Sequence, residues 1–240
     1  MKQESTRLLK KANDVIMETI KSDHNLGYDM IDTLYQLHDI IASVFSEEST
    51  NSKFNWFDCV PSKKNPYYYK IGGMHYESGF KVATDTKILV AEKYEYDADK
   101  ENKTITKDCE SLEGRYPDWK ALFENREYKG TKCTLNVDRV NEIEKIYKAN
   151  KRLDKNYKNF VNVGDAWFDA WYFIEFAKFL QEAKVNEFTI CTERNGYKAV
   201  VNTENVKSIL MGLVIHADHE FTPAFDYFSY MGENAVVEVR

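Results

Sequence analysis

Cysteine is scarce in this sequence, and its spacing excludes the two common roles of paired cysteines. The 240 residues contain only Cys59, Cys109, Cys133 and Cys191, with no CxxC pair. A zinc site needs closely spaced ligands, and a disulfide scaffold needs a denser set of cysteines. We therefore expect free or buried thiols in a reducing compartment, which predicts a cytoplasmic protein.

Long apolar runs are also missing. No segment reaches the ~18 apolar residues that a membrane-spanning helix needs. Residues 1–14 (MKQESTRLLKKAND) have no apolar core of the signal-peptide type. We therefore expect a protein with no membrane partner.

Signatures of catalysis are absent too, since the sequence contains no GxSxG, no P-loop and no GxGxxG motif. The best candidates for a metal site are His216 and His219, beside Asp218 and Glu220. Ligands three residues apart meet on a helix, but this pair falls in a predicted loop, which favours a solvated loop. We expect no enzyme, no metal and no cofactor. An enzyme of unknown type that uses these two histidines is kept as an alternative hypothesis.

The composition is that of a soluble globular protein, with 43% hydrophobic and 30% charged residues. The length suits one large domain or two of ordinary size. A formal net charge of −6 argues against non-specific coating of nucleic acid. It leaves room for a local basic surface on an acidic body.

Residues 71–96 are the best-defined stretch, with β-branched and aromatic residues interrupted at Ser78-Gly79 and at Thr84-Asp85-Thr86. This pattern predicts an antiparallel meander with a compact turn at residues 83–87. Around it the apolar spacing predicts four helical regions: within 1–46, after Pro117, over 139–153 (capped by Asp138), and up to residue 184 (capped by Asp165 or Asp169). It also predicts strands over 54–60, 104–112, 133–137, 160–163, 186–193, 197–203, 206–215 and 235–239.

The most basic stretch follows the middle of the chain. Its cations are Arg139, Lys145, Lys148, Lys151, Arg152, Lys155 and Lys158. A solvated helix face is the simpler interpretation of such a run. The sharper interpretation is a surface that contacts a nucleic-acid backbone without reading its sequence.

Five segments, taken in order, carry a resemblance to a known family. They are IGGMHYESG (71–79), VATDTKILVA (82–91), LEGRYPDWKALF (112–123), FDAWYFIEFAKFL (168–180) and VKSILMGLVI (206–215). Together they resemble the bacterial sliding clamp, the β subunit of the replicative polymerase, and short clamp-like proteins of phages and mobile elements. The likeness covers about residues 71–215, equivalent to the second and third domains of that family.

The resemblance implies an α+β, DNA-clamp-like fold with antiparallel sheets outside and helices on the inner face. It implies two clamp units, residues 1–126 with the N-terminal helices and residues 127–240 with the C-terminal tail. It also implies a non-catalytic protein that binds DNA independently of sequence through basic helices, and a polymerase or other protein through a short peptide. A closed ring of two-unit chains would be a homo-trimer.

The peptide-binding cleft that the resemblance implies comes from three segments. Its residues would be Thr84, Lys87, Ile88, Leu89, Pro117, Leu122, Ile209 and Met211. An apolar groove with a flexible methionine suits varied peptide side chains. Plain core packing is the alternative for the apolar members.

The sequence departs from the family in the turn itself, where Thr86 and Lys87 replace a glycine and a histidine or arginine, and at Gly212, which replaces a closing proline. These departures make the implied fold firmer than the implied peptide binding. A separate alternative to a DNA-binding clamp is a clamp-fold protein-interaction module that no longer encircles DNA.

Overall fold

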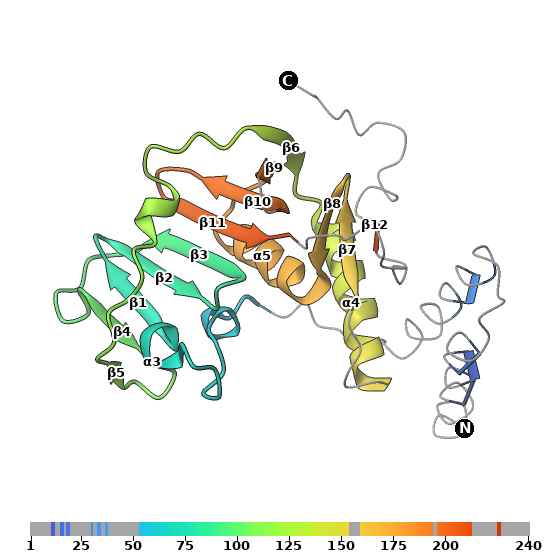
Figure 1. Cartoon of the computed structure of the whole chain (residues 1–240), viewed down its shortest axis with the longest axis horizontal. Helices are drawn as coiled ribbons and strands as arrows, with labels where there is room; N and C mark the ends of the chain where they lie inside the picture. Colours follow the sequence, from blue (N-terminus) through green and yellow to red (C-terminus); the bar gives the residue numbers. More distant parts are fainter. Residues whose placement is uncertain are drawn as a thin grey trace.

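The computed structural model describes residues 53–153, 159–193, 196–212 and 225–226, with short helical pieces between residues 11 and 37 (Figure 1). The predicted strand at 235–239 and the His216/His219 loop lie outside these residues. Across the described ranges, no helix has the length and apolar character needed to cross a bilayer.

Nine strands form one antiparallel sheet in the order β5-β4-β1-β2-β3-β11-β10-β9-β6 (Figure 1). In chain order they are β1 (Met74–Glu77), β2 (Phe80–Thr84), β3 (Ile88–Lys93), β4 (Lys103–Ile105), β5 (Ser111–Leu112), β6 (Gly130–Thr134), β9 (Glu187–Glu193), β10 (Gly196–Asn202) and β11 (Val206–Met211). The predicted α+β class with antiparallel sheets is confirmed.

The two halves of the chain meet at β3 and β11. These strands pair antiparallel, from Ile88 opposite Leu210 to Glu92 opposite Val206. Because β1–β5 come from the first half and β6 and β9–β11 from the second, this one pairing makes a continuous sheet. The predicted units 1–126 and 127–240 therefore share a sheet, and the boundary between them stays a prediction.

Two long helices, α4 (Val137–Leu153) and α5 (Ala170–Glu182), lie on one side of this sheet (Figure 1). In the core on this side, Phe173, Phe176 and Phe179 of α5 pack against Ile88 and Leu210 of the sheet. Each of the three phenylalanines is at most 1% exposed. Aromatic and aliphatic residues recur on one face of α5, so packing against the sheet buries them together.

A smaller sheet, in the order β12-β7-β8, lies beside α4 (Figure 1). Its strands are β7 (Phe160–Val163), β8 (Ala166–Asp169) and β12 (Phe225–Asp226). β7 and β8 are antiparallel, and β12 runs parallel to β7. β8 leads directly into α5, so this hairpin fixes where α5 begins.

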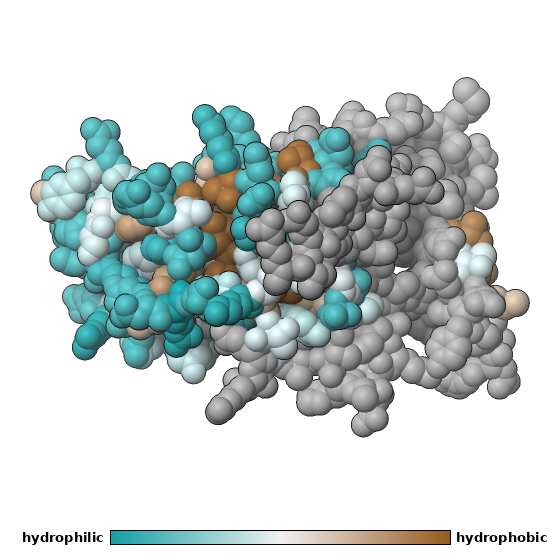
Figure 2. All heavy atoms as spheres, turned by 90° about the horizontal axis from the view of Figure 1, so that it is seen from above, coloured by the Kyte–Doolittle hydropathy of each residue, from teal (hydrophilic) through white to brown (hydrophobic). Residues whose placement is uncertain are grey.

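The opposite face of the large sheet is covered by an irregular segment with one turn of 3-10 helix, η2 (Lys120–Leu122). Tyr116, Trp119 and Phe123 of this segment pack against Leu89 and Ile209. The sheet therefore has a core on each face. Figure 2 shows mostly hydrophilic side chains on the described surface seen from above, with hydrophobic ones gathered near its middle.

The meander prediction is confirmed. Its first turn has positive φ at Ser78 (55°) and Gly79 (75°), and its second has φ of 85° at Thr86, a backbone that a β-branched residue rarely adopts. In the second turn, the Asp85 Oδ1 atom accepts hydrogen bonds from the backbone N–H groups of Lys87 (2.9 Å) and Ile88 (3.2 Å). An aspartate that bonds its own backbone in this way stabilises a tight turn.

Three strand predictions are wrong. The strand predicted over 133–137 is β6 (Gly130–Thr134), and Val137 already begins α4. Residues 54–60 form a 3-10 turn, η1 (Trp56–Cys59), because the Asn55 side chain accepts from the N–H of Phe57 and caps it. The strand over 104–112 is split into β4 and β5. There the hydroxyl and carbonyl of Thr106 accept from the N–H groups of Glu110 and Cys109, and they close a turn.

One of the two predicted helix caps is confirmed and the other is wrong. Asp169 caps α5 as expected, accepting from the N–H of Trp171. Asp138 lies inside the first turn of α4, and the cap is Asn136, whose Oδ1 accepts from the N–H of Arg139 at 3.0 Å. The strand β8 is not predicted, because its short apolar run after Asp165 also fits the first turn of a helix.

We expect Phe176→Ala to lower the free energy of unfolding by about 3–5 kcal/mol, because it opens a cavity among aromatic rings. The Phe176 ring is fully buried and packs edge-on against Phe188, with 5.6 Å between the centroids. Urea denaturation measures the change. Tyr96→Ala is the control, since Tyr96 is 66% exposed; equal losses for both variants would contradict this packing.

Candidate functional site

A hollow of about 660 Å³ opens where three segments distant in sequence meet. Its lining comes from the turn before β3, the last turns of α4, and the junction of β8 with α5. The lining residues are Lys87, Tyr147, Lys148, Lys151, Arg152, Asp169, Trp171 and Tyr172. We call this site the basic hollow, because four of the eight residues are cationic and one is a carboxylate.

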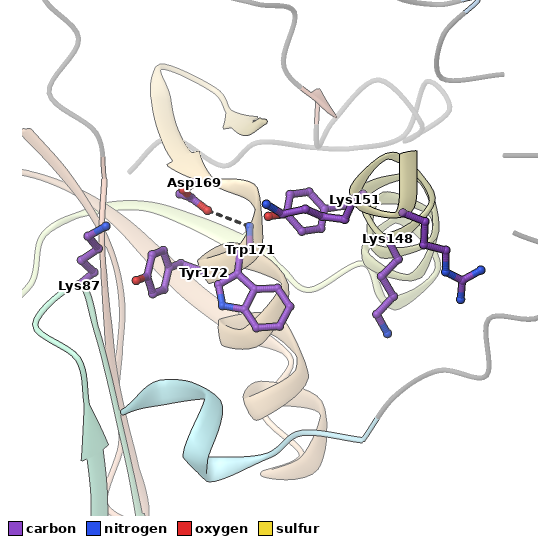
Figure 3. A pocket seen from close by; sticks show the side chains of 8 residues that line it. Lys87, Lys148, Lys151, Asp169, Trp171 and Tyr172 are labelled. Atoms are coloured by element: carbon purple, nitrogen blue, oxygen red, sulfur yellow. Dashed lines mark hydrogen bonds between the residues drawn. The ribbon is translucent and has the colours of Figure 1, made fainter. Parts of the chain in front are cut away.

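Aromatic rings lie between the cations in the basic hollow. Trp171 and Tyr172 project from the first turn of α5, with Lys87 on one side and Lys148 and Lys151 on the other (Figure 3). The Asp169 cap, 3.0 Å from the N–H of Trp171, fixes the start of this turn. Both rings are half-buried, so each keeps part of its surface toward the hollow.

Tyr172 ties the β2–β3 turn to α5. Its hydroxyl donates to Asp85 Oδ2 at 2.5 Å, and the Lys87 ammonium lies 5.0 Å from the centre of its ring. Burial, together with the hydrogen bond to Asp85, raises the pKa of Tyr172 above its ordinary value. The phenol therefore stays protonated at neutral pH and remains a donor, which holds Lys87 at the edge of the hollow.

Tyr147 supports Trp171 from α4. The two ring centroids are 6.4 Å apart and the planes are tilted by 33°. Burial, with a smaller contribution from the negative charge of Asp169, raises the pKa of Tyr147 to about 12. Tyr147 is therefore neutral at physiological pH and acts as an apolar support for Trp171.

A cluster of buried charges sets the position of Lys148. Lys148 Nζ lies 2.5 Å from Glu144 Oε1, and Lys178 Nζ of α5 lies 2.7 Å from the same oxygen and 2.9 Å from Glu175 Oε1. Glu144, Glu175 and Lys178 are all buried. The cluster joins α4 to α5, so it holds the basic side of the hollow against its aromatic side.

The pKa values of this cluster follow from its burial. Burial raises the pKa of Glu175, and the hydrogen bond from Lys178 opposes that shift. For Lys178, burial disfavours the charge, but hydrogen bonds to Glu144 and Glu175 outweigh it and raise the pKa. Lys178 is thus the cation that both buried carboxylates depend on.

The structure brings together only part of the predicted basic surface. Lys148, Lys151 and Arg152 line the hollow. Arg139 is buried and pairs with Glu142 at 2.7 Å, near the other end of α4. Lys145 is half-buried outside the lining, while Lys155 and Lys158 lie outside the described residues.

The residues of the predicted peptide cleft divide between the two faces of the sheet. Leu89 and Ile209 are opposite each other in β3 and β11, and Leu122 packs on the same face. Ile88 belongs to the core under α5. The remaining apolar member near the turn is Met211, which is 39% exposed.

The polar and peripheral members of that cleft are more dispersed. The Thr84 hydroxyl donates to the Ile88 carbonyl inside the turn. Pro117, next to Tyr116 in the segment that covers the opposite face of the sheet, lines a separate polar hollow. The Met211 N–H donates to the Lys87 carbonyl at 2.9 Å, so Lys87 lies beside the cleft residues and also lines the basic hollow. The cleft stays a prediction.

The three aromatic residues of the hollow, Tyr147, Trp171 and Tyr172, are not among the site residues predicted from the sequence. The available signal was the Trp171-Tyr172 pair, which begins two residues after the capping Asp169, in a chain with a basic helix earlier in the same half. Among the described residues, no three His, Cys, Asp or Glu side chains are grouped to hold a metal ion.

The comparisons with known proteins are sparse. No family model matches the sequence. No curated protein matches it. Solved structures of several bacterial sliding clamps are similar to it.

One is the Borrelia burgdorferi DNA polymerase III subunit beta in complex with a natural product, at 12% identity and a TM-score of 0.44, covering 74% of this chain and 62% of that one. A Bartonella birtlesii sliding clamp bound to griselimycin has 12% identity and a TM-score of 0.43, covering 70% and 69%. The Helicobacter pylori beta clamp bound to a DNA ligase peptide has 13% identity and a TM-score of 0.42, covering 74% and 64%.

These structures belong to the family that the sequence motifs resemble. This chain spans less than two thirds of the length of the Borrelia clamp. At such identities and TM-scores the likeness carries no argument about binding, so function has to be argued from the residues of this chain.

We expect Lys178→Met to lower the free energy of unfolding by about 3–5 kcal/mol, because buried Glu175 loses the lysine that it shares with Glu144, while Glu144 keeps its ion pair with Lys148. The loss should be greater at about pH 8 than at about pH 5. A carboxyl whose pKa is raised in the folded state takes up a proton on folding, so its contribution to stability falls as pH rises toward that pKa.

Urea denaturation of both proteins at the two pH values measures this difference. Lys145→Met removes the same charge from a half-buried position of α4 and serves as the control. A Lys178→Met loss that is equal at both pH values would show that Glu144 and Glu175 are not held charged by Lys178.

Proposed function

We propose that this chain is a non-catalytic, sliding-clamp-like protein that binds the DNA backbone through the basic hollow. The observation that carries the proposal is the meeting of Lys87, from the β2–β3 turn, with Lys148, Lys151 and Arg152 of α4 in one hollow. These cations gather on a chain whose formal net charge is −6. Local positive charge on an acidic body attracts phosphates to one place and leaves the rest of the surface repulsive.

The chemistry of the site suits phosphate contacts that ignore sequence. Lysine and arginine bind phosphate oxygens wherever the backbone presents them, and release of counterions supplies much of the affinity. The clamp-like motifs of residues 71–215 support the same function, since the family that they resemble tethers partners to DNA. DNA would therefore be the ligand and no reaction would follow binding.

Stabilisation of the helix end is the simpler explanation for two of these cations. Lys151 and Arg152 occupy the last turn of α4, where positive charge interacts favourably with the helix dipole. That role does not account for Lys87, which comes from a different segment and lies beside Tyr172 (Figure 3). Measured DNA binding separates the two explanations.

A second candidate function is a protein-interaction module that encircles nothing. Met211 favours it, because this flexible side chain is 39% exposed next to Lys87, at the edge of the face that holds Leu89 and Ile209. An extended peptide with apolar side chains would suit that surface. Both functions fit one protein, as the two surfaces lie on opposite sides of the turn at Lys87.

Ring formation is a separate proposal. If each chain supplies two clamp units, a closed ring of six units is a homo-trimer. Light scattering of the pure protein with and without circular DNA tests it. A monomer under both conditions would favour the protein-interaction module.

We expect the double variant Lys151→Glu/Arg152→Glu to bind duplex DNA about tenfold or more weakly than the unchanged protein. The slope of log K against log salt should shrink by about two, since two phosphate contacts are lost. This variant leaves the ion pair between Lys148 and buried Glu144 in place. Fluorescence anisotropy over a salt series gives both quantities.

The control is Lys107→Glu, at an exposed lysine between β4 and β5. In the sheet, β1 and β2 separate these two strands from β3, which follows the Lys87 turn of the hollow. This control makes a single reversal of the same kind on a different surface and should leave the slope unchanged. If the double variant keeps the affinity and slope of the unchanged protein, Lys151 and Arg152 only stabilise the end of α4.

A further inference from the structure

The basic hollow contains more aromatic surface than phosphate binding requires. Three of its eight lining residues are Tyr147, Trp171 and Tyr172. In a duplex the bases are stacked inside the helix, so a protein that holds only the backbone gains nothing from rings in its binding site. An unpaired base, by contrast, has an open face that stacks on an aromatic side chain.

We propose that the basic hollow takes single-stranded nucleic acid, with an unpaired base stacked on Trp171 and the flanking phosphates held by Lys87 and by Lys148, Lys151 and Arg152. This proposal rests on the proposed function, because it names the form of nucleic acid that the same site binds. Grooves that combine cations with aromatic platforms are the common solution for single strands.

Trp171 is the ring best prepared for stacking. It is half-buried, Tyr147 supports it at 6.4 Å, and the Asp169 cap fixes its backbone. A ring that is already held in place loses little conformational freedom when a ligand arrives. Tyr172 is less available, because its hydroxyl is bound to Asp85 and Lys87 lies by its ring.

The cations flank the aromatic rings on both sides. Lys87 lies beyond Tyr172, while Lys148 and Lys151 lie on the side of α4 (Figure 3). A strand that crosses the hollow would therefore meet positive charge before and after the base that rests on Trp171. A compact ligand such as inorganic phosphate would use only one of these sides.

The carboxylate of Asp169 also argues against a small polyanion. It lines the same hollow and repels a phosphate placed at the centre. A ligand with a neutral base in the middle and phosphates at the two ends avoids that repulsion. In a nucleic-acid strand, neutral bases are always flanked by charged phosphates. An acidic peptide has no such regular alternation of neutral and charged groups.

The experiment compares a labelled oligo(dT) strand with a duplex of equal length, using the full chain and fluorescence anisotropy. Trp171→Ala should weaken oligo(dT) binding by about 5- to 150-fold, the range for losing one stacked base, and should weaken duplex binding by much less. Tyr96→Ala removes an exposed aromatic ring in the segment after β3, and it should change neither affinity.

Trp171→Phe provides the second variant. It keeps an aromatic face, so oligo(dT) should still bind with nearly the affinity of the unchanged protein. Binding should quench tryptophan fluorescence in the unchanged protein and lose that effect in Trp171→Phe, although Trp56, Trp119 and Trp167 remain. This readout decides the matter if Trp171→Ala fails to fold.

The outcomes separate the two proposals. Salt-dependent duplex binding without oligo(dT) binding, or oligo(dT) binding that neither variant alters, would overturn the single-strand assignment and leave the proposed function standing. Equal affinity for thymidine monophosphate and oligo(dT) would overturn the strand in favour of a nucleotide. Failure of both nucleic acids to bind would overturn the proposed function as well.

Discussion

The pairing of β3 with β11 is the interaction on which the rest of the structure depends. Five residue pairs, from Ile88–Leu210 to Glu92–Val206, join strands from the two halves of the chain into one sheet. Without them each half would present an unpaired strand edge and an incompletely covered face. With them, α5 covers one face and the segment around Trp119 covers the other. The same pairing places the turn at Lys87 beside the end of β11.

The second constraint is the set of charges buried between α4 and α5. Burying Glu144, Glu175 and Lys178 is costly unless the charges satisfy one another, and the cluster does so through a lysine shared by two carboxylates. Apolar residues of similar size would pack with less penalty. What the charged version supplies is a fixed register between the helices and a fixed anchor for Lys148. We regard this as the reason that the cations of α4 face the aromatic residues of α5.

The proposed function rests on how charge is distributed. The chain is acidic as a whole, yet four cations and three aromatic rings line one hollow. Carboxylates near the hollow have structural bonds, since Asp169 caps α5 and Asp85 accepts from Tyr172 and from the turn. With the carboxylates in structural roles, a protein of net negative charge keeps a local positive surface, the one that we propose binds nucleic acid.

Local patterns are enough to predict the meander within residues 71–96, the helices α4 and α5 and the strands β9–β11, because long periodic runs and turn residues such as Asp85 act locally. Such patterns misassign residues 54–60 and do not reveal β8, since short apolar runs fit several local structures and packing decides between them. Only the tertiary structure placed Lys87 opposite Lys148, and Trp171 between them. That arrangement depends on β3–β11 pairing and on the packing of α4 against α5, which join segments far apart in the chain and leave no local pattern to read.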